Sequence, residues 1–147
     1  MDNPVIEKIL SFKSGLVKET FRKNDRRWYL TIDKKDLPET ARYMFKDLGL
    51  RFSTASAIDL PDDTEILYHF SDDKTGCVIT LRVFAGSRDK AVMPSLTPVA
   101  KAFEWIEREI HELFGVDFEG HPDLKRLLLT DDWPQGEYPL RQKEKGR

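Results

Sequence analysis

The sequence predicts an α+β fold: a two-layer sandwich of helices on a mixed or antiparallel sheet, followed by an extended, irregular C-terminal tail. Three segments carry apolar residues at helical spacing, and five have the composition of strands, with clear alternation over residues 65–71 and 77–84. These segments follow one another in the order αββαβββα up to residue 115. The 147 residues, 39% of them hydrophobic, supply one core and are too few for two full domains.

The chain begins with a helix and a hairpin. The helix is expected over residues 3–14, where apolar residues recur at helical spacing and Pro4 suits the first turn. Two strands should follow, over residues 16–21 and 27–32. Residues 23–26 between them have the composition of a hairpin turn.

A second helix and three more strands form the middle of the chain. Asp36 is placed to cap the helix, Glu39 occupies the capping-box position, and Gly49 ends it. The strands are expected at residues 52–60, 65–71 and 77–84. Short segments rich in turn formers separate these strands, which is typical of a half-buried antiparallel sheet.

The third helix is expected over residues 99–114, after a loop at residues 88–98, and Gly115 closes it. Beyond it, the pattern becomes irregular but keeps large apolar side chains that a disordered segment would lack: Phe118, Leu124, Leu127, Leu128, Leu129, Trp133, Tyr138 and Leu140. Such a segment needs a surface to lie on, either its own domain or a partner. We therefore divide the chain into an α+β domain, residues 1–115, and a partner-binding C-terminal tail, residues 116–147. Deleting the tail should leave a folded domain that no longer assembles.

Composition argues against several classes of function. The 24 basic and 26 acidic side chains nearly cancel, whereas a general nucleic-acid binder usually carries a basic excess. The single cysteine, Cys77, cannot hold an iron–sulfur cluster or a structural zinc alone. The N-terminus has no secretory signal, and no apolar run approaches the roughly 20 residues that cross a bilayer. Any association with a membrane is therefore expected to come through a partner.

The densest charged segment lies on the third helix. Glu104, Arg108 and Glu112 are four residues apart, and the simplest interpretation is a row of ion pairs on one helix face. Glu107 and His111 share that spacing and could hold a metal, but no second histidine follows as in an H-E-x-x-H zinc helix. A metal site is therefore not expected here.

His121 lies beside Pro122 and Asp123. It could act as a general base oriented by the carboxylate, or it could hydrogen-bond a carbonyl and shape a turn, which we favour. Neither a G-x-S-x-G nucleophile elbow nor a Gly-rich phosphate-binding loop occurs. A stand-alone hydrolase that uses His121 with Asp123, or a metal held by Glu107 and His111, remains a remote alternative.

Three stretches together form a recognisable signature: Glu107-Arg108-Glu109, Leu113-Phe114-Gly115-Val116 and Phe118-Glu119-Gly120-His121-Pro122-Asp123-Leu124-Lys125-Arg126-Leu127-Leu128. They resemble the hydrophilic, 30-kDa-type subunit family of respiratory complex I, which includes the matching subunits of membrane-bound hydrogenases and related ferredoxin-using complexes. The spelling Trp133-Pro134-Gln135-Gly136-Glu137-Tyr138-Pro139-Leu140-Arg141 is more similar to the membrane-bound hydrogenase branch.

The resemblance implies a non-catalytic structural subunit without a cofactor of its own. Such a subunit packs beside a large catalytic subunit and a small iron–sulfur subunit, and its C-terminal segment wraps over the large one. The complex would be an ion-translocating, membrane-bound oxidoreductase, of nickel–iron hydrogenase type, held on the cytoplasmic face of the membrane. The alternative is the matching 30-kDa-type subunit of an oxidoreductase that passes electrons from NADH or another donor to quinone, or of a related sulfur-reducing complex.

The same resemblance, read with the chemistry of the side chains, implies a partner interface. Large apolar groups would carry most of the binding energy, and arginines would pair with partner carboxylates. The expected interface residues are Glu107, Arg108, Glu109, Phe114, Gly115, Phe118, Gly120, His121, Pro122, Asp123, Leu124, Arg126, Trp133, Tyr138, Pro139, Leu140 and Arg141. No catalytic, cofactor-binding or metal-binding residue is expected in this chain.

Overall fold

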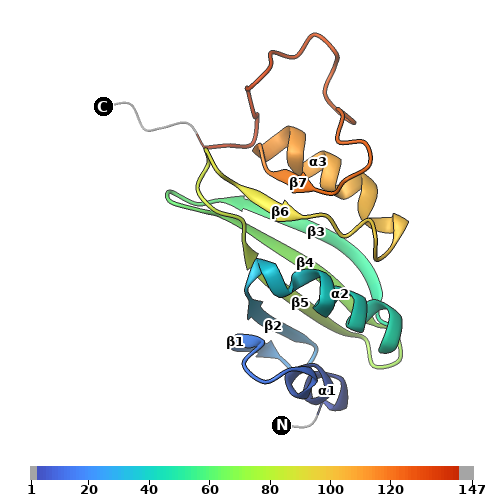
Figure 1. The fold of residues 1–147 in the computed structure, drawn as a ribbon. Helices are drawn as coiled ribbons and strands as arrows, with labels where there is room; N and C mark the ends of the chain where they lie inside the picture. Colours follow the sequence, from blue (N-terminus) through green and yellow to red (C-terminus); the bar gives the residue numbers. More distant parts are fainter. Residues whose placement is uncertain (1–2, 143–147) are drawn as a thin grey trace.

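The computed structural model describes residues 3–142, which form helices packed on a mixed sheet (Figure 1). The α-helices are α1 (Pro4–Phe12), α2 (Leu37–Arg42) and α3 (Glu104–Phe114). The strands are β1 (Val17–Asn24), β2 (Arg27–Ile32), β3 (Arg51–Asp59), β4 (Thr64–Asp72), β5 (Cys77–Phe84), β6 (Val92–Pro94) and β7 (Asp117–Glu119). The α+β class and the order of the predicted elements are confirmed.

The main sheet has five strands in the order β1-β2-β5-β4-β3. Strand β2 runs parallel to β5, with Leu30 opposite Leu81, and the other neighbours are antiparallel. The sheet is therefore mixed, because the crossover from β2 through α2, β3 and β4 brings β5 back beside β2 in the same direction. Strands β1 and β3 are the two edges.

Three details differ from the sequence-based expectation. Asp36 precedes α2 as expected, but its side chain makes no capping hydrogen bond. Strands β6 and β7 pair in parallel within segments expected to be irregular, with Met93 opposite Phe118. Each has only three residues, which is too short to show alternation. Helix α3 begins at Glu104 rather than near residue 99, because Ala100 is extended and the 3-10 turn η3 (Lys101–Phe103) precedes the helix.

The core lies between the helices and one face of the sheet. In β4 the alternate residues Ile66, Tyr68 and Phe70 are fully buried. Phe103 contacts three rings from neighbouring elements, with the Phe52 centroid 4.1 Å away. Helix α1 is capped by the Asn3 side chain, which accepts hydrogen bonds from two backbone amides, and its inward face adds Ile6 and Ile9.

The C-terminal tail includes β7, and beyond this strand it arches past α3 and returns toward the sheet (Figure 1). Its first residues belong to the core, because Val116 is fully buried and Phe118 is only 4% exposed. The irregular part of the tail therefore begins at about Gly120, and the division at residue 115 stays a prediction. None of the helices within residues 3–142 is long and apolar enough to span a bilayer.

Candidate functional site

Helix α3 ends at Gly115, which has a φ of 74° and donates its N–H to the carbonyl of His111 at 2.9 Å. Glycine adopts this left-handed conformation without steric cost. A Cβ at this position would also lie 2.8 Å from Cζ of Arg141 and 2.8 Å from a ring carbon of Tyr138. Position 115 therefore needs a glycine both to end α3 and to admit the returning tail.

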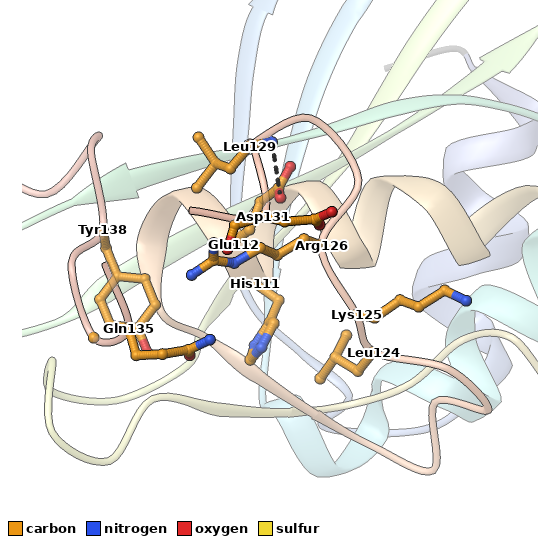
Figure 2. Close-up of a pocket in the computed structure, with 10 residues that line it drawn as sticks. His111, Glu112, Leu124, Lys125, Arg126, Leu129, Asp131, Gln135 and Tyr138 are labelled. Atoms are coloured by element: carbon orange, nitrogen blue, oxygen red, sulfur yellow. Dashed lines mark hydrogen bonds between the residues drawn. The ribbon is translucent and has the colours of Figure 1, made fainter. Parts of the chain in front are cut away.

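The Glu112 carboxylate fixes the middle of the tail. Its side chain points from α3 toward the tail backbone (Figure 2), and the residue is only 5% exposed. It accepts hydrogen bonds from the N–H groups of Leu128 at 2.7 Å, Leu127 at 2.9 Å and Leu129 at 3.3 Å. One buried carboxylate thus takes the place of a strand partner for three successive residues.

Two arginines bind the carbonyl groups of the same segment. Arg108 donates from Nε to the carbonyl of Lys125 at 2.9 Å and from Nη2 to that of Arg126. The Arg126 guanidinium in turn donates to the carbonyls of Thr130, at 2.8 Å, and Trp133. Charged side chains therefore satisfy both the donors and the acceptors of a backbone without a ladder.

The expected row of ion pairs on α3 is wrong. Within residues 3–142 no ion pair joins Glu104, Arg108 and Glu112. Arg108 and Glu112 instead bind the tail backbone. The spacing of residues along one helix does not show that another segment packs on it.

The end of the tail returns to α3 and to β3. Arg141 donates from Nε to the carbonyl of Phe114 and from Nη2 to that of Arg88, both at 2.8 Å. The amide of Gln142 donates to Asp59 at the end of β3, at 2.7 Å. Burial raises the pKa of Asp59, but hydrogen bonds from Arg88 and the Gln142 amide outweigh it, so the pKa lies below its usual value.

His121 has the turn-shaping role that we favoured. Its Nε2 donates to the carbonyl of Glu104 at 2.9 Å, and its Nδ1 accepts from the amide of Asp123 at 3.0 Å. Both ring nitrogens are thus used by the backbone of this chain, and the side chain is fully buried. A general base needs one of these nitrogens for its substrate, so the arrangement does not favour a hydrolase.

Glu107 and His111 do not converge on a shared ligand position. Glu107 is 1% exposed and accepts from the Ser95 hydroxyl at 2.6 Å and from the Leu96 amide at 2.5 Å. Burial raises the pKa of Glu107 above its usual value, although these hydrogen bonds and nearby His121 partly offset the effect. His111 donates from Nδ1 to the carbonyl of Val116. Residues 3–142 contain no group of three or more His, Cys, Asp or Glu side chains placed to hold a metal ion.

A cavity of about 410 Å³ lies between α3 and the arch of the tail (Figure 2). Polar groups dominate its lining: His111, Glu112, Lys125, Arg126, Asp131, Gln135 and Tyr138. The hydrogen bonds described above already engage His111, Glu112 and Arg126. The cavity is therefore shaped by the contacts that hold the tail.

The expected interface residues differ in how far they are buried in the structure. Several serve the chain's own packing: Glu107, Arg108, Gly115, Phe118, His121, Arg126 and Arg141. Phe114 and Leu124 are partly buried against the core, and Tyr138 packs under Arg141. Of the remaining residues, Leu140 is 52% exposed. Contact of the expected interface residues with a partner stays a prediction.

Two exposed apolar residues, Trp105 and Leu128, are not among the expected interface residues. Trp105, 67% exposed, lies outside the apolar stripe of α3, and that departure from helical periodicity was the available signal. Leu128, 63% exposed, is one of three successive leucines, and the sequence does not mark which of them faces outward.

The chain matches the family model described as the 30-kDa subunit of respiratory-chain NADH dehydrogenase, over residues 30–147. It is 37% identical over 118 residues to an NADH-quinone oxidoreductase subunit of Rhodobacter capsulatus, an alignment that covers 76% of this chain and 57% of that relative. The chain thus spans little more than half the length of that relative. It is 33% identical over 135 residues to the membrane-bound hydrogenase subunit beta of Pyrococcus furiosus, which covers 89% of this chain and 78% of the relative.

A similar solved structure comes from a membrane-bound sulfane sulfur reductase, an archaeal respiratory membrane complex. It superposes with a TM-score of 0.82 at 26% identity, over 93% of this chain and 81% of that one.

Proposed function

Because the chain belongs to the family of the 30-kDa subunit of respiratory-chain NADH dehydrogenase, we propose that it is a non-catalytic structural subunit of a complex-I-like, membrane-bound oxidoreductase. Its proposed partners are a large catalytic subunit and a small iron–sulfur subunit, which would carry the clusters and a nickel–iron centre. The protein itself would hold no cofactor and would lie on the cytoplasmic face, attached to the membrane through the complex.

One observation carries this proposal. The tail is fixed from its inner side by the buried Glu112 and by the partly buried Arg141, while large apolar side chains face outward at Leu128 and Leu140. Exposed apolar groups on a backbone that is already ordered bind a partner without the entropic cost of ordering a flexible segment. The geometry therefore supports a preformed docking element.

The hydrogenase branch is our first candidate for the complex. The match to the Pyrococcus furiosus hydrogenase subunit extends over 135 residues, and the match to the Rhodobacter capsulatus quinone oxidoreductase protein over 118. The second candidate is a quinone-reducing or sulfur-reducing complex. The sulfur-reducing type is supported by the superposition on the sulfane sulfur reductase chain, which covers 93% of this chain.

The test is purification of the complex from native membranes through a tag on this chain. We expect a large subunit and an iron–sulfur subunit to co-purify. Nickel bound to the purified complex would support the hydrogenase type, and iron without nickel would support the second candidate. Recovery of the chain only as a free monomer would contradict the proposal.

Variants of the tail sharpen the same experiment. Truncation of an apolar interface residue commonly costs more than about 1 kcal/mol of binding free energy. We therefore expect Leu128→Ser and Leu140→Ser to lower recovery of the large subunit several-fold. The control is Lys8→Ser, which removes an exposed long side chain from α1, and it should leave that recovery unchanged.

A further inference from the structure

The face of the sheet opposite the helices is open. Alternate residues of each strand point to opposite faces, so the buried Ile66 and Tyr68 lie on the helix side and Leu67 on the other side. Within residues 3–142 no helix packs on this second face, and the helices in Figure 1 lie together on the other one. A shallow hollow of about 300 Å³ occupies its middle, lined by Phe21, Lys23, Tyr29, Glu65, Leu67 and Arg82.

The hollow has an apolar floor. Phe21 and Tyr29 lie opposite each other on β1 and β2, and their ring centroids are 6.0 Å apart. Phe21 is 56% exposed, and Phe84, on the neighbouring β5, is 36% exposed. Large aromatic groups gathered on a solvent-facing sheet are typical of an interaction surface.

The accessible charges that line this floor are positive, and the exposed Glu19 lies beyond the lining on the same strand as Lys23. The Arg82 guanidinium donates to the Glu65 carboxylate at 2.7 Å, and only 8% of the Glu65 side chain is exposed, against 38% for Arg82. Among the described residues, Glu65 is the only carboxylate that lines the hollow, and its own partner covers it. Arg82 and Lys23 therefore present the accessible charges of the lining. A partner that covers the hollow would gain from carboxylates placed opposite these two cations.

The edge of the sheet beside the hollow favours an extended partner segment. Among the described residues, β1 pairs with β2 alone, so its outer edge offers unpaired backbone groups next to Phe21 and Lys23. An added strand would hydrogen-bond along this edge and direct alternate side chains into the hollow.

We infer that this open face is a second docking surface, and that it receives an extended, acidic segment of another subunit, which places a large apolar side chain over Phe21 and Leu67. The inference rests on the proposed membership of a complex, and it goes beyond the tail interface. The protein would then connect two partners, one through the tail and one through the sheet.

The test uses a photocrosslinking residue in the assembled complex in native membranes. One form of the chain carries p-benzoylphenylalanine in place of Phe21, and a second carries it in place of Leu128. We expect the probe at position 21 to crosslink to a partner segment rich in Asp and Glu, identified by mass spectrometry. The segment should differ from the one that crosslinks at position 128.

Charge reversal provides the matched control. Lys23→Glu should lower the crosslinking yield at position 21 about fivefold, because attraction to the acidic segment becomes repulsion. Lys74→Glu reverses another exposed charge, in the turn between β4 and β5, and should leave the yield unchanged. Raising the salt concentration should weaken crosslinking at position 21 in the parent chain and have little effect in the Lys23→Glu variant.

Three outcomes would overturn the inference. Crosslinking of position 21 to a second copy of this chain, to lipid or to a segment without acidic residues contradicts the proposed occupant. Crosslinking at position 128 but not at 21 removes the second surface and leaves the proposed function intact. Failure at both positions in purified membranes contradicts both.

Discussion

The sheet domain and the irregular part of the tail carry similar kinds of large apolar side chains but bury them very differently. In the domain, Tyr68, Phe70 and Phe103 are fully buried. In the tail, beyond about residue 120, Leu128 is 63% exposed and Leu140 is 52% exposed. The domain is thus stabilised by apolar burial, and the tail must be ordered by something else.

Hydrogen bonds from charged side chains supply that order. Backbone ladders satisfy the polar groups of the five-stranded sheet. In the tail the same groups are satisfied by Glu112 and Arg126, and Arg141 holds the returning end against α3. A segment built in this way can keep a fixed shape while its apolar side chains remain available to a partner.

The largest expected effect distinguishes the two regions by truncation. A chain ended after Gly120 keeps Val116 and Phe118 in the core, whereas a chain ended after Gly115 loses both. Burial of one such side chain contributes about 1.5–3 kcal/mol. We therefore expect the shorter chain to be less stable than the longer one by about 4 kcal/mol in urea denaturation. Equal stability would show that the domain ends at residue 115.

The longer truncation also tests the independence of the domain. It removes every hydrogen bond between α3 and the residues after Gly120, but it removes no fully buried apolar side chain. Its unfolding free energy should therefore remain close to that of the full chain. Unfolding of the chain ended after Gly120 would show that the tail stabilises the core, and the contrast between the regions would fail.

A pair of aromatic substitutions gives the next largest effect. Phe103→Ala removes a ring packed against Phe52, Phe45 and Phe70, and such a loss typically costs about 3–5 kcal/mol. Trp105→Ala, two residues further along, removes a ring that is 67% exposed and should cost less than about 0.5 kcal/mol. Thermal melting of the two variants measures the difference. A comparable loss for Trp105→Ala would place its ring in the core.

Glu112→Gln should loosen the tail without unfolding the domain. The amide keeps one acceptor oxygen in place of the carboxylate that serves three N–H groups. A hydrogen bond to a charged group contributes about 1.5–3 kcal/mol, so we expect a local loss of about 2 kcal/mol. Hydrogen exchange at residues 127–129 should then be about 30-fold faster.

Two controls accompany this measurement. Glu109→Gln makes the same chemical change on the same helix, at a residue without these three bonds, and should leave exchange in the tail unchanged. Amides of β4 and β5 should keep their protection in both variants. Faster exchange throughout the sheet in Glu112→Gln would mean that the tail and the domain unfold together.

The contrast between the domain and the tail also explains which features could be predicted from the sequence. Periodicity, the Pro4 at the start of α1 and the glycines after two helices predicted the order of the elements, because these signals act over a few residues. Strands β6 and β7 were missed because each is three residues long and its pairing partner is distant in the chain.

The contacts of the tail could not be predicted for a related reason. Glu112 and Arg108 bind backbone groups of residues 125–129, and a backbone N–H or carbonyl leaves no mark in the sequence. The closing contact joins Gln142 to Asp59, 83 residues apart, without a local pattern at either position. The sequence identified the tail as apolar and irregular, but only its fold could show which charged groups hold it.

The smallest expected effect is a change in the pH dependence of stability, caused by Glu107. Burial raises the pKa of this carboxyl above its ordinary value of 4.5, with hydrogen bonds from Ser95 and Leu96 partly offsetting the effect. The folded chain then binds this proton more tightly than the unfolded chain does. The contribution of Glu107 to the unfolding free energy is therefore most favourable below pH 4.5 and falls as the pH rises through the folded pKa.

Glu107→Gln isolates this contribution, because glutamine does not ionise in that range. We expect the unfolding free energy of the parent chain, minus that of the variant, to decrease as the pH rises from 4.5. Asp59 and Asp73, whose pKa values are lowered, produce the opposite slope in both chains and cancel in the difference. Denaturation of both chains at a series of pH values measures this difference in unfolding free energy. A difference independent of pH would mean that the Ser95 and Leu96 hydrogen bonds fully compensate the burial of the Glu107 charge.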